Sequence, residues 1–246
     1  MSQPPVAILC GGRGTRLQEH TREIPKPLVE IGGMPIVWHV IQLYASQGFR
    51  RFLLATGYKG ELIERFVAEH DWPQGVEVRC HDTGADTQTG GRIGRLAPLL
   101  GAERRFCATY ADGLADIDLS ALLDFHEAHG AAATMTVVRP ELQFGVTELD
   151  GENRVTGFRE KPRSEHWING GFFCFEARAL DYIAAGGAGT ILEREPLEGL
   201  ARDSELRAFC HQGFWECMDT YKDAVALNDL WASGEPPWLN QPAGVP

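Results

Sequence analysis

The chain has 246 residues, a formal net charge of −11 and six cysteines, and 43% of its residues are hydrophobic. This acidic balance excludes a general nucleic-acid binder, which needs a basic face, and no apolar run is as long as a membrane span. The N-terminal residues lack the basic and apolar regions of a secretory signal, and the cysteines are scattered without a C-x-x-C pair. We therefore expect a cytoplasmic globular protein with reduced cysteines and no nucleic-acid or membrane partner.

The first half of the chain alternates short apolar runs with stretches of helical periodicity. We predict strands over 6–10, 51–55, 76–80, 106–110 and 134–138. We predict helices over 36–46, 61–69, 93–100 and 119–129. Strands that alternate with helices predict an α/β fold with a mostly parallel, Rossmann-like sheet covered on both faces. Ligands of such sheets bind at the carboxyl ends of the strands, where a glycine-rich loop and Asp112 both lie.

The second half, from about 139 to 233, differs in texture because short turns separate its apolar runs. We predict strands over 145–149, 154–159 and 171–175. We predict helices over 177–184, 190–201 and 221–231. Antiparallel strands would then mix with helices, and we expect one domain over 1–233 that consists of two halves. Residues 234–246 are rich in proline and lack periodicity, so we expect a loosely docked tail.

The glycine-rich loop follows the first predicted strand and reads Gly-Gly-Arg-Gly-Thr-Arg over residues 11–16, with Lys26 between two prolines further on. Glycines let backbone N–H groups approach an anion, while arginine and lysine bind phosphate oxygens. The loop fits neither a dinucleotide fingerprint, which needs a third glycine where Leu17 stands, nor a Walker A loop. A plain turn explains the glycines equally well. The prolines restrict the backbone around Lys26, however, and favour a polyphosphate site.

Together with later segments, this pattern resembles the sugar-1-phosphate nucleotidyltransferases, and within them the glucose-1-phosphate cytidylyltransferases. The resemblance covers about residues 5–232. The segments that carry it are Gly-Gly-x-Gly-Thr-Arg-Leu at 11–17, Pro-Lys-Pro at 25–27, Asp-Thr-Gly at 82–84, Thr-Gly-Gly-Arg at 89–92, Tyr-Ala-Asp-Gly at 110–113, Glu-Lys-Pro at 160–162, Asn-Gly-Gly-Phe-Phe at 169–173, Glu-Pro-Leu at 195–197 and Met-Asp-Thr at 218–220.

The resemblance implies a nucleotide-diphospho-sugar transferase (GT-A-like) fold with a nucleotide-binding half over about 1–138 and a sugar-phosphate-binding half over about 139–233. It implies an enzyme in which a sugar-1-phosphate oxygen attacks the α-phosphorus of a nucleoside triphosphate and releases pyrophosphate. The implied substrates are CTP and α-D-glucose-1-phosphate, and the product is CDP-glucose. Mg²⁺ as cofactor and assembly into a homo-oligomer are implied as well.

The resemblance also assigns roles to residues of this chain. Arg16 is expected to bind the β- and γ-phosphates, Lys26 the α-phosphate and Lys161 the sugar phosphate, and these three form the catalytic set. Nucleotide contacts are expected from Gly11, Gly12, Arg13, Gly14, Thr15, Thr83, Gly84, Thr89, Gly90 and Asp112. Sugar-phosphate contacts are expected from Arg92, Gly145, Glu160, Lys161, Asn169 and Gly170.

Asp112 and Asp219 are the expected Mg²⁺ ligands, because this ion prefers oxygen ligands and bridges to substrate phosphates. Taken alone, each aspartate also fits a helix cap or an Asx-turn. His126 and His129 stand three apart on a predicted helix without a further ligand, so we expect them to pack rather than bind metal.

Two alternatives remain open. The first alternative is the same reaction with other substrates, namely GTP, UTP or dTTP and another hexose, heptose or cyclitol phosphate. It remains open because the segment of residues 71–81 is shorter than the corresponding segment of the cytidylyltransferases. The second is a non-catalytic relative that binds nucleotide or sugar. That alternative predicts the loss of a charged site residue, but all five are present in the sequence: Arg16, Lys26, Asp112, Lys161 and Asp219.

Overall fold

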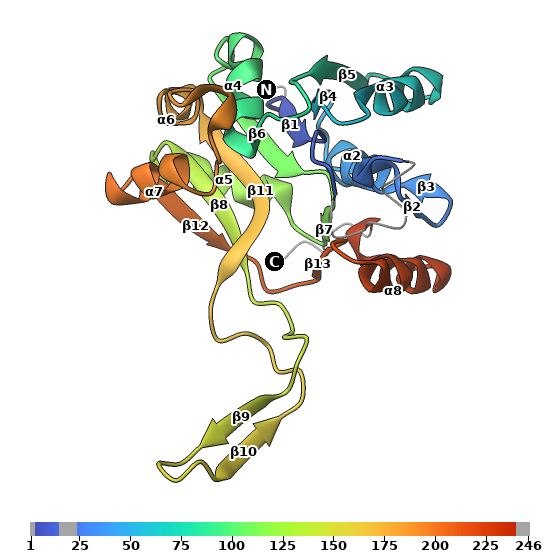
Figure 1. Cartoon of the computed structure of the whole chain (residues 1–246). Helices are drawn as coiled ribbons and strands as arrows, with labels where there is room; N and C mark the ends of the chain where they lie inside the picture. The colour runs from blue at the N-terminus through green and yellow to red at the C-terminus, as the bar shows by residue number, and fades with distance from the viewer. Residues whose placement is uncertain (1–2, 15–23, 240–246) are drawn as a thin grey trace.

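The computed structural model describes residues 3–14 and 24–239, and within them a seven-stranded sheet forms the centre of the molecule (Figure 1). The strands lie in the order β12-β8-β11-β6-β1-β4-β5. Their bounds are β1 (Val6–Leu9), β4 (Arg51–Thr56), β5 (Glu77–Asp82), β6 (Arg105–Tyr110), β8 (Ala133–Val138), β11 (Ile168–Glu176) and β12 (Leu206–Cys210). Neighbouring strands are parallel except around β11, which runs antiparallel to both β6 and β8. The predicted mostly parallel sheet is confirmed.

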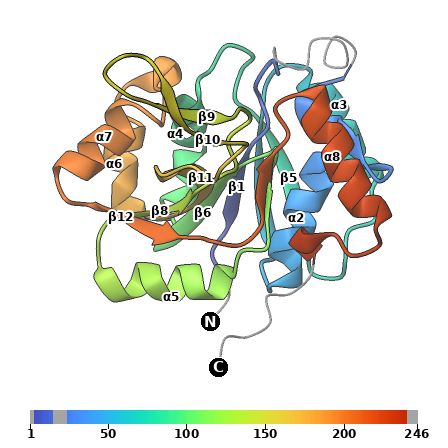
Figure 2. The ribbon, with the colours of Figure 1, turned by 90° about the horizontal axis from the view of Figure 1, so that it is seen from below.

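Helices cover both faces of this sheet, as Figure 2 shows. One face carries α2 (Ile36–Ser46), α3 (Gly60–Glu69), α5 (Leu119–His129) and α8 (Tyr221–Ala232). The other carries α4 (Thr89–Leu100), α6 (Leu180–Ile183) and α7 (Glu195–Arg202). Because side chains alternate along a strand, Val6 and Ile8 of β1 enter the first core while Ala7 enters the second.

Short elements connect and flank these helices and strands. They are the 3₁₀ turns η2 (Lys26–Leu28), η3 (Ala177–Ala179), η4 (Gly187–Gly189) and η5 (Pro237–Leu239), and the strands β2 (Glu30–Ile31), β3 (Met34–Pro35), β7 (Gly113–Ala115) and β13 (Trp215–Cys217). The antiparallel pair of β7 and β13 matters most for function. It brings the chain around residue 218 next to Asp112, more than a hundred residues earlier.

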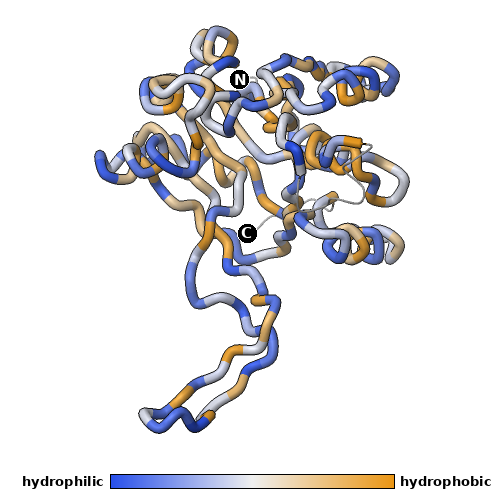
Figure 3. The backbone as a smooth tube through the Cα atoms, in the orientation of Figure 1, coloured by the Kyte–Doolittle hydropathy of each residue, from blue (hydrophilic) through white to orange (hydrophobic). Residues whose placement is uncertain are grey.

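An arm formed by residues 139–167 stands away from the body of the molecule (Figure 1). Its strands β9 (Val146–Leu149) and β10 (Val155–Arg159) pair antiparallel, and no strand of the central sheet adjoins them. Apolar positions recur along this arm in Figure 3, and Phe144 is 80% exposed. Most of the exposed large apolar side chains of the described residues lie on the arm or directly after it.

Several expectations need correction. The tail does not dock loosely as far as the structure describes it, because Trp238 is 2% exposed and belongs to the first core. Strands β7, β12 and β13 were not predicted, and β11 and β12 show that both halves of the chain build one sheet. Helix α4 begins four residues earlier than expected, and α7 five residues later. Among the described residues, no helix is both long and apolar enough to cross a membrane.

Candidate active site

A cavity opens where β1 and β6 end, at the N-terminus of α4. Backbone of the glycine-rich loop forms one wall, and the first turn of α4 forms another. The described residues that line it are Leu9, Cys10, Gly11, Gly12, Gly14, Lys26, Pro27, Thr87, Gln88, Thr89, Arg92, Tyr110, Ala111 and Asp112. The position at the carboxyl ends of parallel strands is the one expected for a ligand site in this kind of sheet.

Lys26 is the central charged group of this cavity. It opens the turn η2 between Pro25 and Pro27, and its side chain is only 14% exposed. Its ammonium donates to Asp112 Oδ2 at 2.5 Å and to Asp219 Oδ1 at 2.7 Å. Burial alone would lower the pKa of Lys26, but the charge of Asp112 and the bonds to both carboxylates outweigh it and raise the pKa. Lys26 is therefore a firmly charged, positioned cation.

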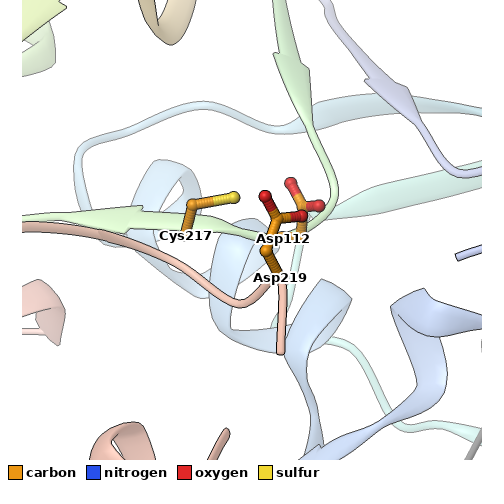
Figure 4. A group of neighbouring side chains, drawn as sticks. All are labelled: Asp112, Cys217 and Asp219. Atoms are coloured by element: carbon orange, nitrogen blue, oxygen red, sulfur yellow. The ribbon is translucent and has the colours of Figure 1, made fainter. Parts of the chain in front are cut away.

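The two aspartates come from distant segments and converge on one point (Figure 4). Asp112 follows β6, Asp219 follows β13, and the Met218 N–H donates to the Asp112 carbonyl at 2.9 Å. The N–H groups of Asp219 and Thr220 donate to the Asp223 carboxylate, and the Thr220 hydroxyl, which caps α8, accepts from the Asp223 N–H in return. The segment around Asp219 is thus fixed by a capping box, a sequence pattern in its own right.

This convergence suits a divalent cation. One ligand atom each of Asp112, Cys217 and Asp219 lies within 4.8 Å of the others, and the Lys26 ammonium already occupies a cation position between the two carboxylates. Two carboxylate oxygens match the preference of Mg²⁺. Cys217 was not predicted at this point. Burial and the nearby Asp112 charge raise the pKa of its thiol, so it is neutral beside the carboxylates.

The glycine-rich loop is described as far as Gly14, which has a positive φ of 58°. Gly11, Gly12 and Gly14 line the cavity, as expected for a loop that presents N–H groups to an anion. Arg13 instead forms an exposed ion pair with Asp86 at 2.8 Å. Thr15 and Arg16 lie outside the described residues.

The structure places three predicted ligand contacts inside the protein framework. The Thr83 hydroxyl donates to the Thr56 carbonyl at 2.6 Å, and Gly84 adopts a φ of +81° beneath the Arg95 side chain. Gly90 does not line the cavity, because it packs closely against Thr190. A Cβ atom added to Gly90 would lie 2.7 Å from the Thr190 side chain. None of the three is among the described residues that line the cavity, and their contacts with nucleotide stay a prediction.

Thr89 and Asn169 belong to a polar network that the sequence did not reveal. Glu193 accepts from the Thr89 hydroxyl at 2.7 Å and also bonds the hydroxyl of Tyr110, which lines the cavity. Asn169 donates to the same Tyr110 hydroxyl at 3.1 Å. Burial and the Glu193 charge raise the pKa of Tyr110, so its hydroxyl keeps its proton. The only available signal for Glu193 was its place two residues before the Glu-Pro-Leu segment.

Arm residues predicted for the sugar phosphate lie away from the cation cluster of the same chain. A Cβ atom added to Gly145 would lie 2.4 Å from the Phe158 side chain and 2.9 Å from the Glu160 side chain. These three residues are therefore neighbours on the arm. Lys161 follows them with a positive φ of 41°. Gly170 lies in β11, where its carbonyl accepts from Trp215 Nε1 at 2.8 Å. Figure 1 shows the arm pointing away from the glycine-rich loop.

Comparisons with known proteins agree with this geometry. Residues 6–223 match the nucleotidyl transferase family. A protein named probable glucose-1-phosphate cytidylyltransferase from Bacillus subtilis (strain 168) is 40% identical over 250 residues, covering 94% of this chain and 97% of that protein. Glucose-1-phosphate cytidylyltransferase from Salmonella typhi is 40% identical over 252 residues with the same coverage. Among solved structures, HddC from Yersinia pseudotuberculosis complexed with GMP-PN aligns with a TM-score of 0.71 at 19% identity, covering 93% of this chain and 100% of that chain. At that identity the structural likeness shows a shared fold alone.

Proposed function

The chain belongs to the nucleotidyl transferase family, and on that premise we propose that it joins a nucleoside triphosphate to a sugar-1-phosphate. The reaction class is supported by relatives at 40% identity over nearly their whole length. Their names give the substrates that we propose, CTP and α-D-glucose-1-phosphate, with CDP-glucose and pyrophosphate as products.

The reaction needs no covalent intermediate with the protein. An oxygen of the sugar phosphate attacks the α-phosphorus, the bond from that phosphorus to the β-bridging oxygen breaks, and pyrophosphate leaves with the electron pair. The barrier in such a displacement arises from bringing anions together and from the charge that gathers on the phosphoryl oxygens. Positioned cations and N–H donors lower it.

One observation carries the proposal: the Lys26 ammonium is held between Asp112 and Asp219 at the edge of the glycine-lined cavity. A triphosphate in that cavity places its α-phosphate beside Lys26. The lysine then donates to the two phosphate groups that react, and Gly11, Gly12 and Gly14 offer N–H groups to the rest of the chain of phosphates. We propose that Arg16, which lies outside the described residues, binds the leaving pyrophosphate.

Asp112 and Asp219 would hold Mg²⁺, and the pair fits that ion because its two oxygens already share one cation. When bound, the ion neutralises charge on the triphosphate oxygens. The family supports a divalent metal, and Mg²⁺ is our specific proposal. The carboxylates themselves accept no proton in this scheme, and they fix the Lys26 ammonium until substrate phosphate competes for it.

The sugar phosphate is proposed to lie beyond Lys26, towards Asn169 and Gly170. Glu160 and Lys161 belong to the proposed sugar site but are carried outward on the arm. We therefore propose a homo-oligomer in which the arm contacts a second copy of the chain. The exposed apolar side chains of the arm, such as Phe144 and Phe158, would be covered in that contact. All six cysteines are free thiols, which agrees with the proposed cytoplasmic location.

The test is pyrophosphate release with Mg²⁺, using CTP, UTP, GTP, dTTP and ATP, each with a panel of sugar-1-phosphates that includes glucose-1-phosphate. Release with CTP and glucose-1-phosphate supports the whole proposal. Release with another pair keeps the reaction class and replaces the substrates. A folded protein that binds nucleotide but releases no pyrophosphate with any pair would contradict the proposal and favour a binding-only relative.

A further inference from the structure

Arg92 lies beneath the glycine-rich loop and is 3% exposed. Its guanidinium reaches from the first turns of α4 to the ends of three neighbouring strands. One nitrogen, NH2, donates to the Gly11 carbonyl after β1 at 2.8 Å. The other, NH1, donates to the Thr56 carbonyl at the end of β4 and, after β5, to the Thr83 hydroxyl and the Gly84 carbonyl, at 2.9, 2.7 and 3.0 Å. A single side chain thus connects the proposed phosphate loop to the proposed base wall.

The partners of Arg92 are all neutral. Among the described residues it forms no ion pair, although a buried charge ordinarily has a charged partner. Burial lowers the pKa of Arg92, yet an arginine keeps its proton at any physiological pH. A buried positive charge that has no ion pair among the described residues therefore lies directly behind a loop whose proposed ligand is a polyphosphate, and the charge of Asp82 acts on it only from a distance. That placement favours the binding of an anion in the cavity. A glycine turn without a ligand would gain nothing from a buried positive charge behind it.

Two glycines make room for this guanidinium. A Cβ on Gly11 would lie 1.9 Å from Arg92 NH1, and a Cβ on Gly57 would lie 2.5 Å from the same nitrogen. Gly57 belongs to no motif that the sequence revealed. A side chain at either position would displace the guanidinium from its hydrogen bonds, and at Gly57 it would also meet the Gly84 carbonyl at 2.7 Å. This constraint is separate from the approach of a ligand.

The bonds to Arg92 also orient the loop. A trans peptide is planar, so its carbonyl and the following N–H point in opposite directions. With the Gly11 carbonyl directed at the guanidinium, the Gly12 N–H points to the other side, away from Arg92. The Gly84 carbonyl is held in the same way and directs the Ala85 N–H away from the guanidinium.

We propose that Arg92 is a positioning residue for the nucleoside triphosphate. It sets residues 11–14 and 83–85 in one fixed arrangement before the nucleotide arrives, so the triphosphate and the base meet donors that are already aligned. This inference rests on the proposed function and replaces the sugar-phosphate contact that the sequence resemblance assigned to Arg92. The guanidinium acts through the backbone of the loop.

The test uses Arg92→Met and Arg92→Lys, with Arg65→Met on the exposed face of α3 as a control that removes the same charge. Calorimetry measures the dissociation constant of CTP, and steady-state rates give KM for each substrate. We expect Arg92→Met to weaken CTP binding and raise KM for CTP by about 10- to 100-fold, with KM for glucose-1-phosphate changed by less than about threefold. Arg92→Lys, which keeps the charge and loses the fork, should fall between wild type and Arg92→Met.

The opposite pattern, a raised KM for the sugar phosphate with unchanged CTP affinity, would overturn the proposal in favour of direct contact. If Arg92→Met does not fold, Arg92→Lys and amide hydrogen exchange decide. Faster exchange at residues 11–14 and 83–85 in the folded Lys variant is expected, and unchanged exchange with unchanged CTP affinity would overturn the proposal. Failure of the proposed function is separate, because the wild-type protein would then release no pyrophosphate with any substrate pair.

Discussion

The Lys26 ammonium lies 2.7 Å from a carboxylate oxygen of Asp219, although 193 positions separate the two residues in the chain. The pairing of β7 with β13 creates this contact, since it carries the Met-Asp-Thr segment to the end of β6. A second carboxylate, that of Asp112, binds the same ammonium. The charge balance of the site is therefore set by one lysine and two aspartates, and it changes when either a metal or a phosphate enters.

Removing the lysine tests its proposed part in the reaction. Lys26→Met should lower kcat for pyrophosphate release by about 10²- to 10³-fold, because a positioned donor to the reacting phosphate is lost. Lys222→Met, on the exposed face of α8, removes the same charge elsewhere and should leave kcat close to wild type. A Lys26→Met enzyme with wild-type kcat would show that the lysine serves only to pair the aspartates.

Metal binding without nucleotide should respond to Lys26 and Asp219 in opposite directions. Lys26→Met should bind Mn²⁺ several times more tightly, since the ammonium no longer competes for the carboxylates. Asp219→Asn should bind Mn²⁺ several times more weakly, whereas Asp229→Asn on the outer face of α8 should not differ from wild type. Electron paramagnetic resonance of free Mn²⁺ gives each affinity, and weaker binding by Lys26→Met would contradict the competition.

The end of the described chain should contribute strongly to stability. Trp238 is 2% exposed, its ring centroid lies 5.8 Å from that of Phe214 with the two planes tilted by 31°, and its indole donates to His39. Trp238→Ala should lower the free energy of unfolding by about 3–5 kcal/mol, the range for a fully buried large aromatic. Trp167→Ala, a half-exposed tryptophan on the arm, is the matched control and should cost much less. Urea unfolding measures both, and equal effects would mean that the tail is not held by Trp238.

His39 should make stability depend on pH. Its Nε2–H donates to the Ile31 carbonyl at 2.8 Å, so Nδ1 accepts from the Trp238 indole and a proton there would break that bond. Burial lowers the pKa of His39 below its ordinary 6.5. The folded state therefore holds a neutral His39, and its stability contribution is present above pH 6.5 and declines as the pH falls below it.

The slope of that decline can reach about 1.4 kcal/mol per pH unit for one proton. The measurement is urea unfolding between pH 7.5 and 5.0, with His39→Gln beside wild type. Burial also lowers the pKa of His129, which therefore makes the same contribution to the pH dependence of stability in both proteins. The difference between the two curves then isolates the contribution of His39. Parallel curves would contradict the assignment.

The arm should control the oligomeric state. Replacing Phe144 and Phe158 by serine removes two exposed aromatic side chains from the proposed contact. The dissociation constant of the assembly should rise at least tenfold, which equals about 1.4 kcal/mol, so smaller species should become more abundant. Leu99→Ser, on α4 and 45% exposed, is the control on another surface. Sedimentation velocity measures the distribution, and a monomeric wild-type protein would remove the basis of the prediction.

Much of the fold could be predicted because buried strands and amphipathic helices leave periodic patterns. The helix Leu119–His129 was predicted with its observed bounds, since Asp118 caps its start and Gly130 ends it. Strands β12 and β7 left no such pattern. The first lies at the edge of the sheet with exposed residues, and the second is only three residues long.

The site could be predicted only in part, and for a physical reason. Motifs name residues that lie close in sequence, so Lys26, Asp112 and Asp219 were found, and the structure brings all three together. Arg92 was found too, but three of its four partners are carbonyl oxygens, which any sequence would supply. Glu193 and Gly57 act through tertiary contacts alone, and no local pattern marks them.

The contact between Lys26 and Asp219 also determines when the site can form while the chain is being synthesised. Domains fold largely from the N-terminus as the chain is made, but closing a long loop requires both of its ends. A nascent chain that stops before β13 holds Lys26 and Asp112 without Asp219. The phosphate-binding half can therefore form early, whereas the cation-binding pair exists only once residue 219 has left the ribosome. Unfinished chains are thus without a completed site.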